Sequence, residues 1–109
     1  MGRSKPGTPS SKPALIAYLT LEIRIEGAHS LKDKRQVMRS LKDKLRAHFN
    51  VAVAELDATG LWQRATLGVV SISDSRDYLD GLMHHVEREA LRVANNAGGE
   101  VIDSFLEFL

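Results

Sequence analysis

An alternation of apolar and polar residues runs through residues 15–26 and constrains the fold of this chain more than any other feature. Leu15, Leu19 and Ile23 belong to the apolar set, while Tyr18 and Glu22 belong to the set between them. Successive side chains of a β-strand point to opposite faces, so this pattern is typical of a strand with one buried face. We therefore expect a long, half-buried strand here.

A helical spacing of apolar residues follows the strand. Residues 27–30 interrupt the alternation, and Ser30 is placed to cap the start of a helix. The sequence predicts an amphipathic helix over residues 31–49, because apolar residues then recur every three or four positions. These residues are Leu31, Met38, Leu41, Leu45 and Phe49.

Two further strands, a second helix and a last strand complete the pattern. Residues 51–57 and 64–73 have the composition of strands, and the short link at 58–60 predicts a hairpin. Asp74 is placed as the N-cap of a second amphipathic helix, and residues 100–109 close the chain as a strand. The order β-α-β-β-α-β is that of an α+β, ferredoxin-like fold, which predicts a four-stranded antiparallel sheet with both helices on one face. We call the opposite, uncovered side of the sheet the open face.

Length and composition indicate one ordinary soluble domain. The 109 residues are 43% hydrophobic and 27% charged, which suffices for a core without disulfides. The absence of cysteine excludes disulfides, thiolate zinc sites and cysteine nucleophiles. No apolar run approaches the roughly 18 residues of a membrane-spanning helix, so we expect a cytoplasmic protein. Residues 1–13 lack an apolar anchor, so we expect a disordered leader there and a single domain over residues 14–109.

The charge is divided unevenly along the chain. The net charge of +1 hides a first helix with seven Lys or Arg against two acids, a local charge of +5. The leader adds three more basic residues, which leaves the rest of the chain at −7. A nucleic-acid-binding protein that is basic throughout would not show this division, whereas a domain with one basic face on an acidic body would.

Four segments also resemble a known family. Residues 19–25, 30–35, 49–55 and 61–65 read LTLEIRI, SLKDKR, FNVAVAE and LWQRA, and they are similar to the YlxP-like family of small bacterial proteins. The resemblance extends over residues 15–109. It implies a ferredoxin-like fold, and it suggests a connection with RNA or the ribosome, because family members are often encoded near translation and ribosome-maturation genes.

The first helix carries a candidate binding surface, which we call the basic stripe. The side chains of Arg35, Arg39, Lys42 and Arg46 lie within about 60° of one another around the helix, over about 16 Å of its length. Lys32 extends this row, and both acids of the helix fall beside it. The free N–H groups at the Ser30 end add an anion site. Such a row fits the phosphates of one nucleic-acid strand, although a solvated surface helix would also be rich in Lys and Arg. The basic stripe consists of Lys32, Arg35, Arg39, Lys42 and Arg46.

The open face is less suited to RNA. Its predicted carboxylates, among them Glu22, would repel a phosphate backbone, and Tyr18 is the only aromatic among the outward positions of the first strand. Phe105 stands at a position where members of the YlxP-like family tend to have a polar residue, which makes this face more apolar and more prone to bind other surfaces. We expect a protein contact here, such as a second copy of the chain. The interaction residues would be Ile16, Tyr18, Thr20 and Phe105.

Other candidates are weaker. Trp62 could stack on a base, but a tryptophan folded over the end of the core is the more common arrangement. Asp77, Asp80 and His84 share one face of the second helix and could hold a divalent ion, yet nothing in the sequence supplies a further ligand, so we assign no metal site. The sequence contains no glycine-rich phosphate loop, nucleophile elbow or zinc-protease spacing. We therefore expect no catalytic residues and no cofactor.

The sequence thus favours a non-enzymatic protein that contacts RNA or ribosomal particles through the basic stripe, with Arg64 as an accessory. The alternative is a protein-interaction module or homodimer that binds no nucleic acid. A small-molecule-binding or catalytic domain stays open only because this fold supports many functions.

Overall fold

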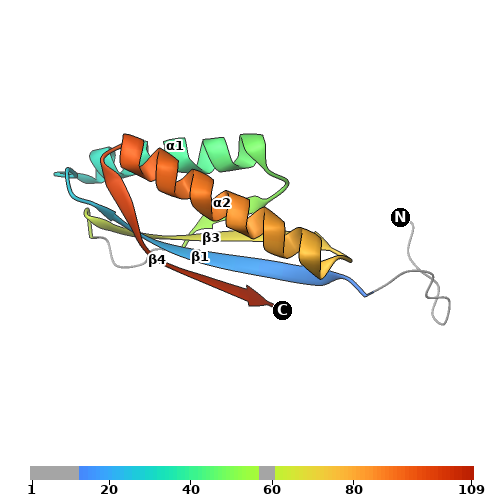
Figure 1. Ribbon diagram of the computed structural model, residues 1–109. Coiled ribbons are helices and arrows are strands. Elements are labelled where there is room, and N and C mark those ends of the chain that lie inside the picture. Colours follow the sequence, from blue (N-terminus) through green and yellow to red (C-terminus); the bar gives the residue numbers. More distant parts are fainter. Residues whose placement is uncertain (1–12, 57–60) are drawn as a thin grey trace, which may run out of the picture.

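The computed structural model describes residues 13–56 and 61–109. Within them the predicted order β-α-β-β-α-β is confirmed, and the fold is ferredoxin-like (Figure 1). The expected leader, except Pro13, and the expected turn at residues 58–60 lie outside the described residues. The elements are β1 (Leu15–Ile25), α1 (Leu31–His48), β2 (Ala52–Glu55), β3 (Arg64–Ser73), α2 (Arg76–Asn96) and β4 (Gly99–Phe108).

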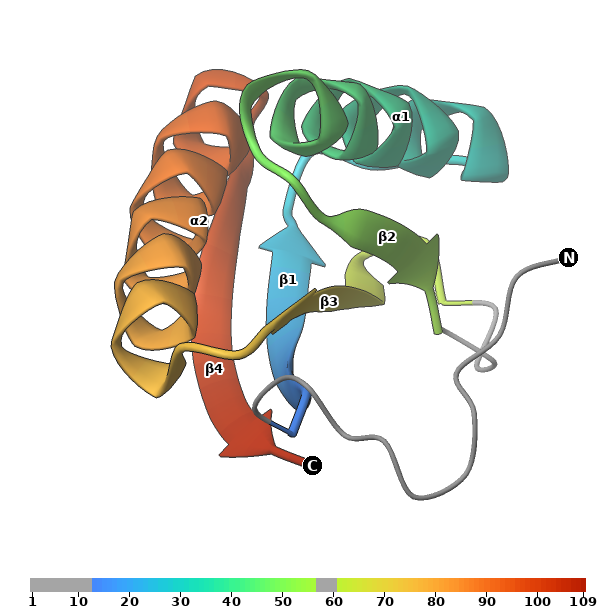
Figure 2. The same cartoon turned by 90° about the vertical axis from the view of Figure 1, so that its right-hand side faces the viewer.

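The four strands form one antiparallel sheet in the order β2-β3-β1-β4. The long strand β1 is central: it pairs with β3 from Leu15↔Ser73 to Arg24↔Arg64, and with β4 on its other side. Strand β2 is a short edge strand, shorter than the predicted 51–57. Both helices lie on the same side of the sheet, so its other side has no covering layer (Figure 1; Figure 2 shows the same arrangement turned by 90°).

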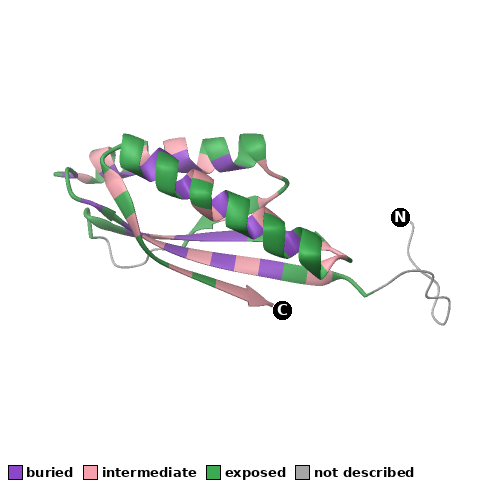
Figure 3. Ribbon diagram, in the orientation of Figure 1, coloured by how far each residue is buried: buried purple, intermediate pink, exposed green. Residues whose placement is uncertain are grey.

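The core lies between the helices and the inward face of the sheet. From Ala17 to Ile25 every second residue of β1 is buried, as the alternation predicts, and the buried residues of α2 follow its sheet-facing side (Figure 3). Each large side chain removed fully from water in this way stabilises the fold by roughly 1.5–3 kcal/mol. The fully buried set includes Leu21, Ile23, Met38, Leu41, Leu45, Leu67, Leu79, Met83 and Val86.

The helix ends follow from local polar residues, with one correction to the sequence prediction. Ser30 caps α1 as predicted. The N-cap of α2 is Ser75 and not Asp74, because the Ser75 hydroxyl accepts the hydrogen bond from the Tyr78 N–H at 3.1 Å. Asp and Ser are both favourable N-cap residues, so residue type alone does not choose between Asp74 and Ser75. Ser75 is the cap because it has the extended backbone conformation directly before the first helical residue. After α2, Gly98 adopts a φ of 87°, a conformation that residues with a Cβ rarely adopt.

Candidate nucleic-acid interface on the first helix

The start of α1 uses its own acid, so this acid is not available to the basic stripe. The Ser30 hydroxyl accepts from the Asp33 N–H at 3.2 Å, and the Asp33 carboxylate accepts from the His29 N–H at 2.9 Å. Asp33 precedes Arg35 by two residues and therefore points about 160° away from it around the helix. The only acid of the Lys-Asp-Lys-Arg run thus stabilises the helix terminus and leaves the stripe unneutralised there.

The N-terminal half of the basic stripe is exposed and unpaired. Lys32, Arg35 and Arg39 are all exposed, and within residues 13–56 and 61–109 none of them forms an ion pair. They span about 10 Å along the helix at ~1.5 Å per residue. These three cations therefore form a small positively charged surface that is neutralised by ions from solution and not by side chains of the described residues.

The C-terminal half of the stripe is partly neutralised. Lys42 Nζ lies 2.8 Å from Glu55 Oε2, and the two side chains are 23% and 38% exposed. Arg46 lies 3.7 Å from Asp43, which is beside the row as the sequence placed it but close enough to pair. Glu55 reaches the stripe because β2 lies beside α1 and because Glu55 pairs with the core residue Leu67, which turns it toward the helices.

Arg64 is not brought to the stripe. It begins β3 opposite Arg24, and its neighbour Ala65 is buried toward the helices. Because side chains alternate along a strand, Arg64 belongs to the open face. The accessory role expected from the sequence therefore has no geometric support on the α1 side.

Lys34 was counted with the basic residues of this helix, but it is a buried residue. It is only 6% exposed, and its ammonium donates a hydrogen bond to the Leu61 carbonyl at 2.7 Å. The sequence contained this signal, since Lys34 falls on the same helix side as the buried Met38 and Leu45. Its role is to fix the segment before β3 against the second turn of α1.

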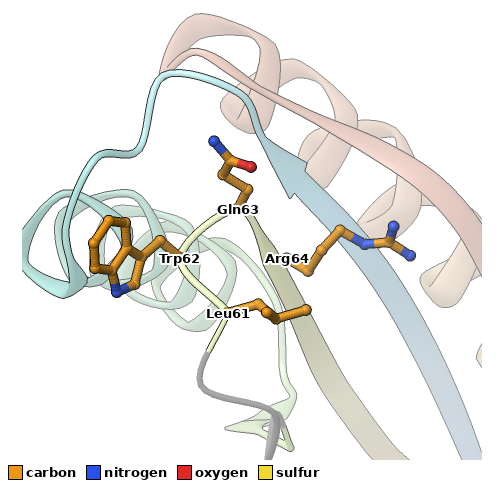
Figure 4. A pocket seen from close by; sticks show the side chains of 4 residues that line it. All are labelled: Leu61, Trp62, Gln63 and Arg64. Carbon is orange, nitrogen blue, oxygen red and sulfur yellow. The ribbon is translucent and has the colours of Figure 1, made fainter.

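The segment held by Lys34 carries the tryptophan. Trp62 is 50% exposed and is not part of the core, so the expectation that it folds over the end of the core is wrong. It lines a shallow hollow of about 320 Å³ with Leu61, Gln63 and Arg64. In Figure 4 the side chains of Trp62 and Arg64 point away from each other, with Trp62 on the α1 side.

The open face is more apolar than the sequence indicated. Ile16, Tyr18 and Thr20 lie on it as expected, and Thr20 is paired with Phe105, which is 62% exposed. Sequence reasoning missed further apolar residues that are exposed here, above all Ile72, paired with Ile16 and 60% exposed. The others are Leu56, Val70 and Leu109.

A groove of about 380 Å³ crosses the open face, lined in part by Tyr18, Leu56, Gly68 and Val70. Gly68 leaves room for the Leu56 side chain: a Cβ on this residue would lie 2.7 Å from Leu56 Cδ1 and 3.3 Å from Tyr18 Cε1. The glycine therefore lets Leu56 lie across the sheet. The groove offers an apolar contact surface whose lining has no charged side chain.

Polar side chains of the two helices meet away from the stripe, at Glu89 of α2. Glu89 of α2 lies 3.5 Å from His48 of α1 and 2.6 Å from Arg92. The hydrogen bond from Arg92 lowers the pKa of the Glu89 carboxyl below its ordinary value, against the opposing effect of desolvation. On the face of Asp77, Asp80 and His84, to which the sequence assigned no metal, the His84 Nδ1 lies 2.7 Å from the Asp80 carbonyl oxygen and 3.5 Å from the Asp80 carboxylate. Among the described residues, no three His, Cys, Asp or Glu side chains lie close enough to hold a metal, and no helix is long and apolar enough to cross a membrane.

Solved structures share this fold at low sequence identity. The chain is similar to a C-terminal segment of the α subunit of aIF2 from Pyrococcus abyssi, with 16% identity, a TM-score of 0.54, and coverage of 89% of this chain and 51% of that one. It is also similar to a dinuclear metal-binding peptidase of the M20 family from Bacillus subtilis (13% identity, TM-score 0.59, 96% and 30% coverage). A de novo designed protein, Foldit4, matches with 11% identity and a TM-score of 0.53 over 89% and 97% of the chains. The chain spans about half or less of the two natural proteins, and these likenesses show the fold alone.

Sequence relatives identify the family. The uncharacterized protein YlxP of Bacillus subtilis (strain 168) is 34% identical over 62 residues, which cover 57% of this chain and 67% of the relative. The family model described as "Protein of unknown function (DUF503)" matches residues 16–105. The chain therefore belongs to this YlxP-like family.

Proposed function

We propose that this protein is a non-enzymatic binding protein that contacts RNA, within ribosomal particles, through the basic stripe of α1. The observation that carries the proposal is the group of three exposed cations, Lys32, Arg35 and Arg39, which have no ion-pair partner among the described residues. A cation without an ion-pair partner does not have to break a contact within the protein before it binds phosphate. Its attraction to the phosphate is therefore not offset by the loss of an ion pair.

Binding would consist of phosphate neutralisation with little reading of bases by the stripe. Three cations on a single strand give a slope of log K against log salt of about −2, from −0.7 per contact. Lys42 and Arg46 would add to this slope only if phosphate displaced Glu55 and Asp43. The affinity is therefore predicted to be modest and to fall about twentyfold between 50 and 200 mM salt.

Co-sedimentation with ribosomal particles on a density gradient tests the proposal. The informative variant is Arg35→Glu with Arg39→Glu, since reversing Lys42 would also set two carboxylates against each other. A matched control, Lys44→Glu with Arg88→Glu, makes the same change in net charge at exposed helix positions outside the stripe. We expect wild type and control to sediment with a subunit at low salt, and the stripe variant to stay at the top. Wild type that stays at the top at low and at moderate salt would contradict the proposal.

A second candidate is self-association through the open face, and the exposed apolar side chains there favour it. Leu56, Ile72 and Phe105 are 47%, 60% and 62% exposed, although large apolar side chains are usually buried. Contiguous exposed apolar patches on a soluble protein mark interaction sites. A homodimer that buries about 800 Å² per partner, the area of a standard interface, would cover these side chains.

Light scattering at several salt concentrations tests the second candidate. A dimer that persists as salt rises, and that Ile72→Glu dissociates, would support packing of the open faces, because apolar contacts are not screened by salt. Leu91→Glu is the matched control, since Leu91 is exposed on α2. A monomer at all salt concentrations would exclude this candidate and leave the basic stripe as the interaction surface.

A further inference from the structure

Trp62 and its surroundings have the features of a built site and not of a packing residue. A tryptophan of the core would be buried, yet half of this side chain is exposed beside Leu61, which is also exposed. Placing a large aromatic ring in water lowers stability relative to burying it. The ring therefore stands where a ligand or partner could cover it.

The backbone that carries the ring is fixed on both sides. The buried Lys34 ammonium donates to the Leu61 carbonyl at 2.7 Å, and the Ile25 N–H donates to the Gln63 carbonyl at 2.9 Å. One bond comes from α1 and the other from the end of β1, so two separate elements hold the residues before and after Trp62. A ring on a fixed backbone loses little conformational entropy when something stacks on it.

The same bond holds the segment that carries the ring against the start of α1, where the stripe is unpaired. The side chain of Arg35 leaves the helix about 100° from that of the buried Lys34, whereas Lys32 points about 160° away from it. A strand whose phosphates contact Arg35 can therefore follow the helix surface to the side of Trp62. In Figure 4 the ring lies on the α1 side of the segment, with Gln63 between it and Arg64. The hollow of about 320 Å³ is at the lower limit of ligand sites and suits a single base.

We propose that Trp62 is a stacking platform for one unpaired nucleobase of the RNA strand that the basic stripe holds by its phosphates. This inference rests on the proposed function and adds to it a preference for single-stranded over double-stranded RNA. In a duplex the bases are stacked on one another and their faces are not available to the ring, whereas a single strand offers each base to it. The Gln63 amide can hydrogen-bond the edge of the stacked base.

The intrinsic fluorescence of the protein tests this directly, because Trp62 is the only tryptophan in the chain. The full chain is titrated with a short oligoadenylate and, separately, with a blunt RNA duplex of the same length. We expect the single strand to quench the emission and the duplex to bind in a salt-dependent manner without quenching. A single strand that binds with the predicted salt dependence and leaves the emission unchanged would overturn the stacking site, but not the stripe.

Variants give a second, independent readout. Trp62→Ala is expected to weaken binding of the single strand by about 5- to 150-fold and to leave the duplex unaffected, while Trp62→Phe recovers most of the affinity. An equal loss for both RNAs would overturn the stacking site. Absence of salt-dependent binding by either RNA to the wild-type protein would instead contradict the proposed function itself.

Discussion

Replacing Glu55 by glutamine is predicted to strengthen RNA binding. Glu55 holds Lys42 at 2.8 Å and thereby withdraws one cation from the basic stripe. The substitution keeps the shape of the side chain and removes its charge. Lys42 is then available to phosphate, and a carboxylate that repels the strand is gone.

The size of the gain follows from the geometry. A phosphate in contact with Lys42 would lie about 6 Å from the Glu55 carboxylate, where repulsion in water amounts to about 0.7 kcal/mol. We therefore expect an affinity two- to fivefold higher at low salt. The slope of log K against log salt should steepen by about 0.7, as expected for one additional phosphate contact. Because both partners are partly exposed, the substitution should reduce the free energy of unfolding by less than about 1 kcal/mol.

Fluorescence polarisation of a labelled single-stranded RNA, measured between about 50 and 200 mM salt, provides affinity and slope together. The matched control is Glu107→Gln, which makes the same change in net charge on β4, at the sheet edge opposite to β2. An equal gain in both variants would show only a general charge effect. No gain from Glu55→Gln would refute the placement of phosphate along this half of α1.

Three further predictions concern the fold that supports the stripe. The Glu89 carboxyl should titrate by NMR below its ordinary pKa and return toward that value in Arg92→Gln, because the Arg92 hydrogen bond stabilises the charged form. With the folded-state pKa below the unfolded one, this pair stabilises the protein above the ordinary glutamate pKa and loses its effect as pH falls through the folded-state value. If Arg92→Gln lowered the free energy of unfolding by the same amount at every pH, this prediction would be contradicted. Gly98→Ala should lower the free energy of unfolding in urea by about 1–2 kcal/mol, since its φ is 87°. Gly81→Ala, in the interior of α2 with open space around it, should raise the free energy of unfolding by up to about 1 kcal/mol. If both substitutions changed the free energy of unfolding in the same direction, the reasoning would be refuted. Leu67→Ala should cost about 2–5 kcal/mol, and a smaller loss would mean that the core collapses around the cavity.

The sequence predicts the elements because their periodicities differ so clearly. The alternation of residues 15–26 corresponds to β1, and the predicted bounds of the hairpin strand 64–73 are those of β3. Ser30 at the start of α1 was readable because its hydroxyl acts on a residue three positions away. Local patterns of this kind need no knowledge of the rest of the chain.

The open face was only partly readable. Strand β3 is apolar on both sides, with Val70 and Ile72 outward, while the inward position between them is taken by a serine. A period of two does not distinguish the faces of such a strand. The buried Ser71 is accommodated because its hydroxyl donates to the Asn50 carbonyl at 2.7 Å, a contact 21 residues away in the chain.

The charge pairing of the stripe could not be predicted for a similar reason. Lys42 and Glu55 are 13 residues apart and meet only because β2 lies beside α1. Helical spacing alone does predict that Lys34 falls on the buried side of α1. A count of the basic residues on that helix includes Lys34 although its charge is not on the surface. A charge total along a sequence therefore overstates the charge that a surface presents.

An NMR titration of the isotope-labelled protein with a short single-stranded RNA locates the binding surface residue by residue and needs no mutation. RNA binding through the stripe predicts shifts at low salt concentrated on Lys32, Arg35 and Arg39, which fade as salt is added, with Lys44 on the far side of α1 unaffected. Shifts centred on Ile72 and the open face, or no shifts at low salt, would contradict RNA binding by the basic stripe.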